Sequence, residues 1–162
     1  MIRRASAADL PVLEAARMGE VWMHHLRERL AMQDQGRATM LLAWGDVRPC
    51  GNATVLRASK YEEVRTLHPD LAEINALAAY PTGRGTGTAL IAAAEDDARA
   101  HGHPLIGLAV DADDNPDARR LYERLGYTLL EGVRVLDVWQ EFRADRDGPW
   151  HRDPCVYLTK RL

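Results

Sequence analysis

A glycine-rich segment in the middle of the chain has the composition of a loop that binds an anion. It reads YPTGRGTGTALIAAAEDDARAHG over residues 80–102, with three glycines at alternate positions and an alanine-rich run after them. The first amides of a helix have no partner within it, and the helix dipole adds roughly half a positive charge there. Glycines let a phosphate approach such amides closely. The segment therefore predicts a phosphate site, to which Thr82, Arg84, Thr86 and Thr88 can add donors.

Two common phosphate-binding motifs do not fit this segment. The P-loop pattern GxxxxGK[ST] requires a lysine that is absent here. The dinucleotide pattern GxGxxG requires a third glycine, but the sixth position is Thr88 when counted from Gly83 and Leu90 when counted from Gly85. A tight glycine turn that leads into a helix, with no ligand at all, remains an alternative.

A third pattern fits the segment and the strand that precedes it. The stretch AEINALAAYPTGRGTGTALI, residues 72–91, resembles the acetyl-CoA-binding core of the GNAT superfamily of N-acetyltransferases. In that core a strand beginning AE leads through a proline to R/Q-x-x-G-x-G/A and a helix. Gly85 and Gly87 match the two final positions of this pattern. Thr82 stands where the family has Arg or Gln, and Arg84 can supply the missing cation.

A second signature supports the resemblance. NPDARRLYERLGY, residues 115–127, is similar to the family pattern N-x-x-A-x-x-LY-x-x-x-G-[FY], and both ends of the chain resemble the family's first and last elements. The resemblance implies direct transfer of an acetyl group from acetyl-CoA to a primary amine, in a ternary complex and without a metal. A small-molecule acceptor is the leading interpretation. A protein N-terminal or lysine acetyltransferase, and a non-catalytic acyl-CoA-binding module, remain open.

The resemblance also assigns residues to the cofactor. The amides of residues 83–88 would hold the pyrophosphate, and the backbone of Leu77 and Ala79 would pair with the pantetheine arm. Asn115 would cap its own helix and also contact pantetheine. The residues expected to bind the cofactor are Leu77, Ala79, Thr82, Gly83, Arg84, Gly85, Thr86, Gly87, Thr88, Asn115 and Tyr122.

Three side chains are candidates for proton transfer. A free alkylamine has a pKa of about 10.4, so a base must take a proton from it. Glu73 stands at the position that serves as general base in some family members, and His151 is a second candidate. Tyr122 matches the family's general-acid tyrosine, which would protonate the departing thiolate. The structural alternatives are a polar contact at a strand end for Glu73 and core packing for Tyr122.

The acceptor site is expected between the first two helices and the segment before the last strand. The candidate residues there are Trp22, His25, Trp139 and His151. Aromatic walls suit a small or amphipathic amine, although Trp22 and Trp139 could equally be core. The acidic run DADDNPD, residues 111–117, could attract a cationic acceptor or simply be a solvated loop and helix cap. A polyamine, an aminoglycoside-like amine, an amino acid and a protein N-terminus all remain open.

The surrounding sequence predicts a mixed α/β (α+β) fold. We expect helices over residues 6–20, with Asp9 as N-cap, and over 21–35, 87–100 and 115–126. Strands are expected over 1–4, 70–80, 105–112, 132–142 and 155–162, with a strand–turn–strand unit over 37–59 and a polar loop over 143–153. With the resemblance, this implies a mostly antiparallel sheet of about seven strands and four main helices, splayed between two parallel central strands.

Composition fits one soluble domain over residues 1–162. The chain is 46% hydrophobic and 28% charged, and its net charge of −3 includes no basic block that would indicate nucleic-acid binding. No apolar run approaches the length of a membrane span. Cys50 and Cys155 lie far apart and form no metal motif, which favours a reducing cytoplasm. A homodimer is compatible with the family.

Overall fold

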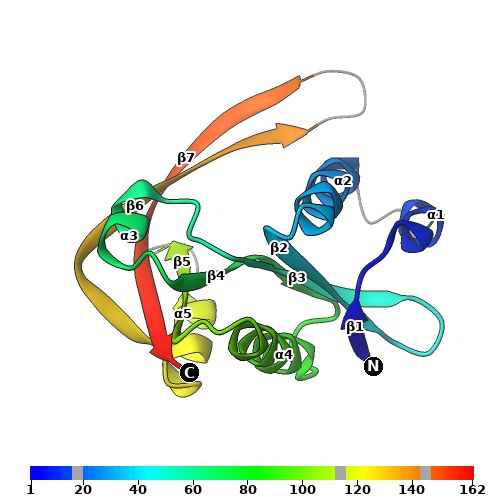
Figure 1. Ribbon diagram of the computed structural model, residues 1–162. Coiled ribbons are helices and arrows are strands. Elements are labelled where there is room, and N and C mark those ends of the chain that lie inside the picture. Colours follow the sequence, from blue (N-terminus) through cyan, green and yellow to red (C-terminus); the bar gives the residue numbers. More distant parts are fainter. Residues whose placement is uncertain (16–19, 112–115, 143–146) are drawn as a thin grey trace.

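The structure is a computed structural model. It describes the backbone of residues 1–15, 20–111, 116–142 and 147–162, and the side chains of those residues except 20–25, 140–142 and 147. Its centre is a seven-stranded sheet with the strand order β1-β2-β3-β4-β5-β7-β6 (Figure 1). The strands are β1 (Ile2–Arg4), β2 (Ala38–Trp44), β3 (Pro49–Leu56), β4 (Leu71–Ala79), β5 (Leu105–Asp111), β6 (Thr128–Phe142) and β7 (Asp147–Arg161).

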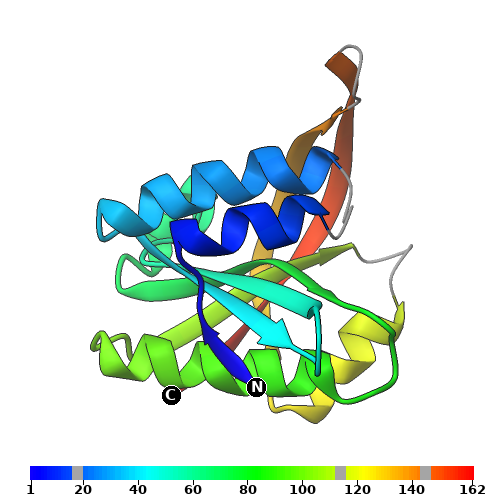
Figure 2. The ribbon, with the colours of Figure 1, turned by 90° about the vertical axis from the view of Figure 1, so that its right-hand side faces the viewer.

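Helices cover both faces of the sheet (Figure 2). The helical elements are a 3-10 turn η1 (Ala7–Asp9), α1 (Leu10–Ala15), α2 (Glu20–Asp34), α3 (Glu62–Leu67), α4 (Thr86–Ala100) and α5 (Pro116–Arg124). On one face, α4 and α5 bury the largest apolar cluster, which includes Ile91, Ile106 and Leu158. On the other face, α1 and α2 pack over β2, and α3 packs near β6 and β7.

The two central strands run parallel but stay paired over a short length. β4 and β5 are in register from Leu71–Leu105 to Glu73–Gly107, while β4 continues to Ala79 and β5 to Asp111. Ala76 has a left-handed φ of 53°, and the β3–β4 register shifts opposite it. The Asn52 side-chain amide donates to the Ala76 carbonyl at 2.6 Å and holds this bulge in place. The β4–β5 pairing ends at Glu73 although both strands continue, so the expected splay is confirmed.

Most of the predicted elements are present, but one helix was missed and two expectations were wrong. The short helix α3 was not predicted, since Val64 is its single buried residue and gives no helical period. Residues 147–153 belong to β7 and not to a loop, because this polar segment pairs with the outer half of β6. Asp9 is not an N-cap, because its carboxylate accepts the Ser6 amide at 2.8 Å as the third helical residue of a capping box.

Two further observations bear on the expectations from composition. Cys50 and Cys155 are both free thiols. In the part of the chain that the structure describes, no helix is long and apolar enough to cross a membrane.

Candidate active site

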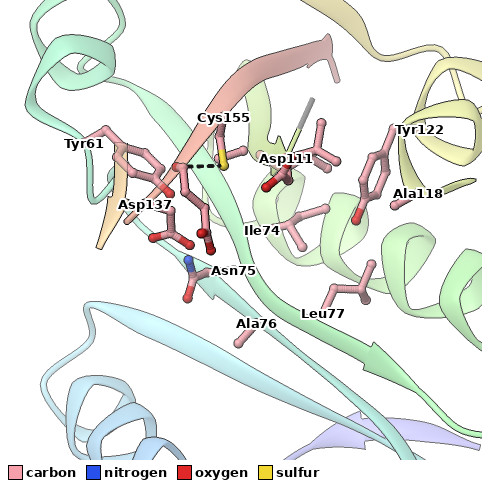
Figure 3. Close-up of a pocket in the computed structure, with 14 residues that line it drawn as sticks. Tyr61, Ile74, Asn75, Ala76, Leu77, Asp111, Ala118, Tyr122, Asp137 and Cys155 are labelled. Carbon is pink, nitrogen blue, oxygen red and sulfur yellow. Dashed lines mark hydrogen bonds between the residues drawn. The ribbon is translucent and has the colours of Figure 1, made fainter. Parts of the chain in front are cut away.

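A cavity of about 260 Å³ lies where β4 and β5 separate. On the α4/α5 face of the sheet its wall includes Ala118 and Tyr122 of α5, and on the opposite face it includes Tyr61 and Asp137 (Figure 3). Asp153, which pairs with Asp137 in the β6–β7 register, also lines the cavity. The gap between the two strands therefore joins the two faces of the sheet. A ligand on one face can reach a ligand on the other through this opening.

Tyr122 directs a hydroxyl group into the cavity (Figure 3). The side chain is 9% exposed, and its ring packs edge-on against Tyr127 with ring centroids 6.0 Å apart. Among the described residues, none forms a hydrogen bond with this hydroxyl. Burial raises the pKa of Tyr122 to about 12, because the phenolate would be poorly solvated. The group is therefore a protonated donor at neutral pH.

The glycine segment forms the turn between β4 and α4. Gly83 and Gly85 have φ values of 74° and 80°, which glycine adopts without strain. Gly85 is the N-cap of α4, and no side chain caps the helix there, so the first helical amides face outward without a side-chain partner. Residues 82–85 are exposed. An anion can therefore approach the start of α4 from solvent.

The edge of β4 beyond Glu73 is open toward the cavity. β3 pairs with β4 as far as Ala79, whereas the pairing with β5 ends at Glu73 in the residues that the structure covers. Leu77 lies on this free edge and lines the cavity. Backbone N–H and C=O groups on such an edge can pair with an extended ligand as a strand would.

Glu73 lies beside the cavity but does not form its wall. It is 1% exposed, and its Oε2 accepts hydrogen bonds from the Tyr157 hydroxyl at 2.9 Å and from the Ser59 hydroxyl. Burial raises the pKa of Glu73 above its usual range, while these two donors and the charge of Lys60 oppose the shift. Asn75, two residues further along the same face, does line the cavity and accepts a 2.6 Å hydrogen bond from Arg29 of α2.

The cavity is acidic on the face opposite Tyr122. Asp111, Asp137 and Asp153 line it, and Lys60 forms an ion pair with Asp137. Burial and then the charges of these three carboxylates raise the pKa of the Cys155 thiol to about 11, while the charge of Lys60 opposes the shift. A cation is favoured at this end of the cavity.

Trp139 and His151 lie on the β6–β7 hairpin next to the acidic wall. Their rings stack at 4.2 Å, and Trp139 Nε1 donates to Asp153 at 2.7 Å. Neither residue is part of the cavity wall.

Comparison with known proteins places this architecture in a family. The family model of the acetyltransferase (GNAT) family matches residues 8–127. The chain belongs to the GNAT family. A search of curated proteins found no match.

Solved structures share the fold of this GNAT chain over almost its full length. A ribosomal-protein-alanine N-acetyltransferase from Brucella melitensis has a TM-score of 0.68 and 20% identity, covering 100% of this chain and 99% of that one. A phosphinothricin acetyltransferase from Sinorhizobium meliloti in complex with acetyl-CoA has a TM-score of 0.65 and 18% identity, and the match covers 100% of this chain and 88% of that one. The Bacillus subtilis acetyltransferase in complex with CoA has a TM-score of 0.65 and 15% identity, and the match covers 99% of this chain and 97% of that one.

The structure brings some of the predicted GNAT site residues together and leaves others apart. Tyr122 and Leu77 line one cavity, and the turn over residues 82–88 follows the open edge of β4. Asn115 lies outside the described residues. Trp22 and His25 belong to α2, but their side chains are outside the described part.

Sequence reasoning missed several residues of the cavity wall. Tyr61, Asn75, Asp137 and Cys155 line it, and Arg29 reaches Asn75 from α2. One signal in the sequence could have found Asp137. Val133, Val135 and Asp137 alternate along β6, and a carboxylate on the buried side of a strand requires an explanation.

Proposed function

We propose that this chain is an N-acetyltransferase that moves an acetyl group from acetyl-CoA to the primary amine of a small molecule, with residues 1–162 as one catalytic domain. The observation that carries the proposal is the Tyr122 hydroxyl, a buried donor without a partner among the described residues that points into an opening between the two faces of the sheet. Such an opening lets donor and acceptor meet without a covalent enzyme intermediate.

The cofactor would lie along α4, the free edge of β4 and α5. The amides of residues 83–88 suit a pyrophosphate, and Thr82 and Arg84 add a hydroxyl and a cation at the exposed turn. The β4 backbone around Leu77 and Ala79 suits the amide groups of pantetheine. The acetyl-CoA and CoA complexes of two structural relatives support this ligand.

The chemistry requires three events at the opening. The neutral amine nitrogen attacks the thioester carbonyl carbon, and a β4 backbone amide can stabilise the oxyanion. The C–S bond then breaks, and the electron pair stays on sulfur. Because burial raises the pKa of Tyr122 to about 12, its contribution is a hydrogen bond to the developing thiolate, and the thiolate takes a proton from solvent as CoA departs. Glu73 takes the amine proton through water, since it lies behind the cavity wall.

The acidic wall supports an amine acceptor. Asp111, Asp137 and Asp153 face the cavity, while Lys60 partly offsets Asp137. A protonated amine would be attracted to this end and would lose its proton nearer to the thioester. Trp139 and His151 can contact the outer part of an acceptor from the hairpin.

An amine panel tests the proposal. Purified protein is incubated with acetyl-CoA and with polyamines, aminoglycoside-like amines, amino acids and N-terminal peptides, and the products are identified by mass spectrometry. We expect one acetylated small amine for each CoA released. Acetylation confined to peptides would make the chain a protein acetyltransferase. Acetyl-CoA binding in calorimetry without turnover of any amine would make it a binding module.

A further inference from the structure

The carboxylate of Glu73 is held by one of its two oxygens. Oε2 accepts both the Tyr157 hydroxyl, at 2.9 Å, and the Ser59 hydroxyl. Oε1 is also buried, and within the described residues it has no hydrogen-bond partner, while the backbone of Lys60 lies close enough to help lower the pKa of this carboxyl. A buried carboxylate oxygen without a partner is costly, unless water or a ligand group satisfies it. The asymmetry leaves Oε1 as the oxygen that can take up a proton.

Gly107 makes room for Tyr157 to reach Glu73. Gly107 lies opposite Glu73 in the β4–β5 register, and Tyr157 comes from β7 on the far side of β5. A Cβ at Gly107 would lie 2.5 Å from Tyr157 Cε1 and 3.0 Å from its hydroxyl oxygen. The tyrosine ring therefore crosses β5 over the one position that lacks a side chain. Its edge-on contact with Tyr61, at 6.1 Å between ring centroids, fixes it from the other side.

The second donor is oriented by its own hydrogen bonds. The Ser59 hydroxyl oxygen accepts the Tyr61 amide at 3.2 Å, so its proton is free to point at Glu73. The Ser59 carbonyl accepts a bond from Arg65 of α3 at 2.8 Å. Donors from two separate elements, β7 and the segment before α3, thus converge on the same oxygen.

The hydrogen bonds of Tyr157 and Ser59 to Glu73 lie where β4 and β5 separate. Glu73–Gly107 is the last β4–β5 pair before the cavity, and Asn75 and Tyr61 next to it form the cavity wall. The charged and titratable groups around Glu73 are Arg29 from α2, Lys60 and Tyr61 from the segment before α3, Tyr157 from β7, and Asp137 of β6 through Lys60.

We propose that Tyr157 and Ser59 are positioning residues that hold Glu73 by Oε2, so that Oε1 receives the proton of the acceptor amine through one water molecule, and that Gly107 is the position that admits Tyr157. The inference rests on the proposed function. One proton leaves the amine nitrogen, a proton of the bridging water reaches Oε1, and Glu73 forms no bond to carbon. Glu73 returns the proton to solvent after the product leaves.

The dependence of kcat on pH tests this assignment, with the amine identified by the panel at saturation. Each of Tyr157→Phe and Ser59→Ala removes one hydrogen bond to the ionised carboxylate, which raises the pKa of Glu73. We expect the acidic limb of the profile to move up by about one pH unit in each variant, with acetyl-CoA affinity unchanged. Gly107→Ala should move the limb in the same direction, provided that its circular dichroism spectrum matches that of the wild type.

A matched tyrosine serves as the control. Tyr127 donates to the buried carboxylate of Glu95 at 3.1 Å on the opposite face of the sheet. Tyr127→Phe also removes a buried tyrosine–glutamate bond and keeps the ring, so it should lower stability to a similar degree. In Tyr127→Phe the acidic limb of the kcat–pH profile should lie at the same pH as in the wild type. A merely structural role for Tyr157 would make the two variants behave alike.

A second comparison separates the inference from the proposed function. In a Glu73→Gln background, adding Tyr157→Phe should change kcat less than twofold, because the group that it positions is gone. A full and additive loss would overturn the assignment, as would an unmoved limb in Tyr157→Phe and Ser59→Ala. In both cases amine acetylation by the wild type would still stand. If the wild type acetylates no amine, the proposed function and this inference fall together.

Discussion

At the scale of single side chains, the cavity keeps a neutral donor apart from a group of carboxylates. Tyr122 is protonated on the α5 face, and Asp111, Asp137 and Asp153 lie on the other face. Such a separation suits an amine that attacks a thioester. The carboxylates attract the positive charge of the amine before the reaction, and the Tyr122 hydroxyl stabilises the negative charge that develops on sulfur.

Neutralising the acidic wall should weaken the binding of cationic acceptors. Asp137→Asn and Asp153→Asn are each expected to lower kcat/KM for the amine about tenfold, with acetyl-CoA affinity unchanged. Lys60→Met should lower KM for the amine, because it removes the cation that competes for Asp137; kcat is compared separately, since Lys60 also lowers the pKa of Glu73. Steady-state kinetics at low and moderate salt checks this. If Lys60→Met also weakens the amine, the acidic wall does not bind the acceptor.

The residues that could be predicted at this scale lie in contiguous motifs. Tyr122 and Glu73 can be predicted because each falls in register with one of the two signatures, and their roles remain predictions. Tyr61, Asp137 and Cys155 come from three distant segments that meet only when α3, β6 and β7 pack together. The spacing of residues along the sequence does not indicate which distant segments will come into contact.

At the scale of elements, the start of α4 and the free edge of β4 define where the cofactor would lie. Gly83 and Gly85 adopt left-handed φ values, so side chains there would strain the turn. Gly87 lies inside α4, and a Cβ there would meet no atom closer than Leu121 Cδ2 at 4.0 Å. Gly87 can therefore be changed without disturbing the fold.

Gly87→Glu should reduce acetyl-CoA affinity about 100-fold. The carboxylate would cover the first amides of α4 and repel the pyrophosphate, and hydrogen bonds to a charged group are worth about 1.5–3 kcal/mol each. Gly87→Ala is the steric control, and we expect it to lose less than threefold. Isothermal calorimetry measures both. Equal affinities for Gly87→Glu and the wild type would remove the phosphate site from the start of α4.

Most elements could be predicted because their signals are local. The α5 helix has Pro116 at its first position and Gly126, with a φ of 90°, after its end, and both residues mark the helix ends as predicted. The outer half of β7 could not be predicted. Its polar sequence, DGPWHRD, becomes a strand because β6 supplies a partner from Asp137 to Phe142.

At the scale of the whole molecule, the sheet separates the two proposed ligand sites, which the gap between β4 and β5 would connect. The cluster with α4 and α5 supports one site, and the clusters with α2 and α3 support the other. Glu73 is buried at the boundary between them, so its ionisation affects the stability of the fold as well as the chemistry.

The buried carboxyl should make stability depend on pH in a definite direction. Since burial raises the pKa of Glu73 in the folded state, its contribution is fully present below the unfolded pKa of about 4.5 and is lost as pH rises through the folded value. The melting temperature of the wild type relative to Glu73→Gln should therefore fall as pH increases from about 4.5. Thermal unfolding of both proteins measures it. A constant difference across this range would contradict a raised pKa.

The central claim is that the Tyr122 hydroxyl stabilises the thiolate that leaves the acetyl group in the opening between β4 and β5. The most direct test is the rate of CoA release with an accepted amine, measured for the wild type and Tyr122→Phe together with acetyl-CoA affinity by calorimetry. The ring still packs against Tyr127 in this variant, so the change removes one donor and little else. We predict a fall in kcat of about 100-fold with affinity unchanged within twofold. An unchanged kcat, or a loss confined to acetyl-CoA affinity, would contradict the account and make Tyr122 a packing residue.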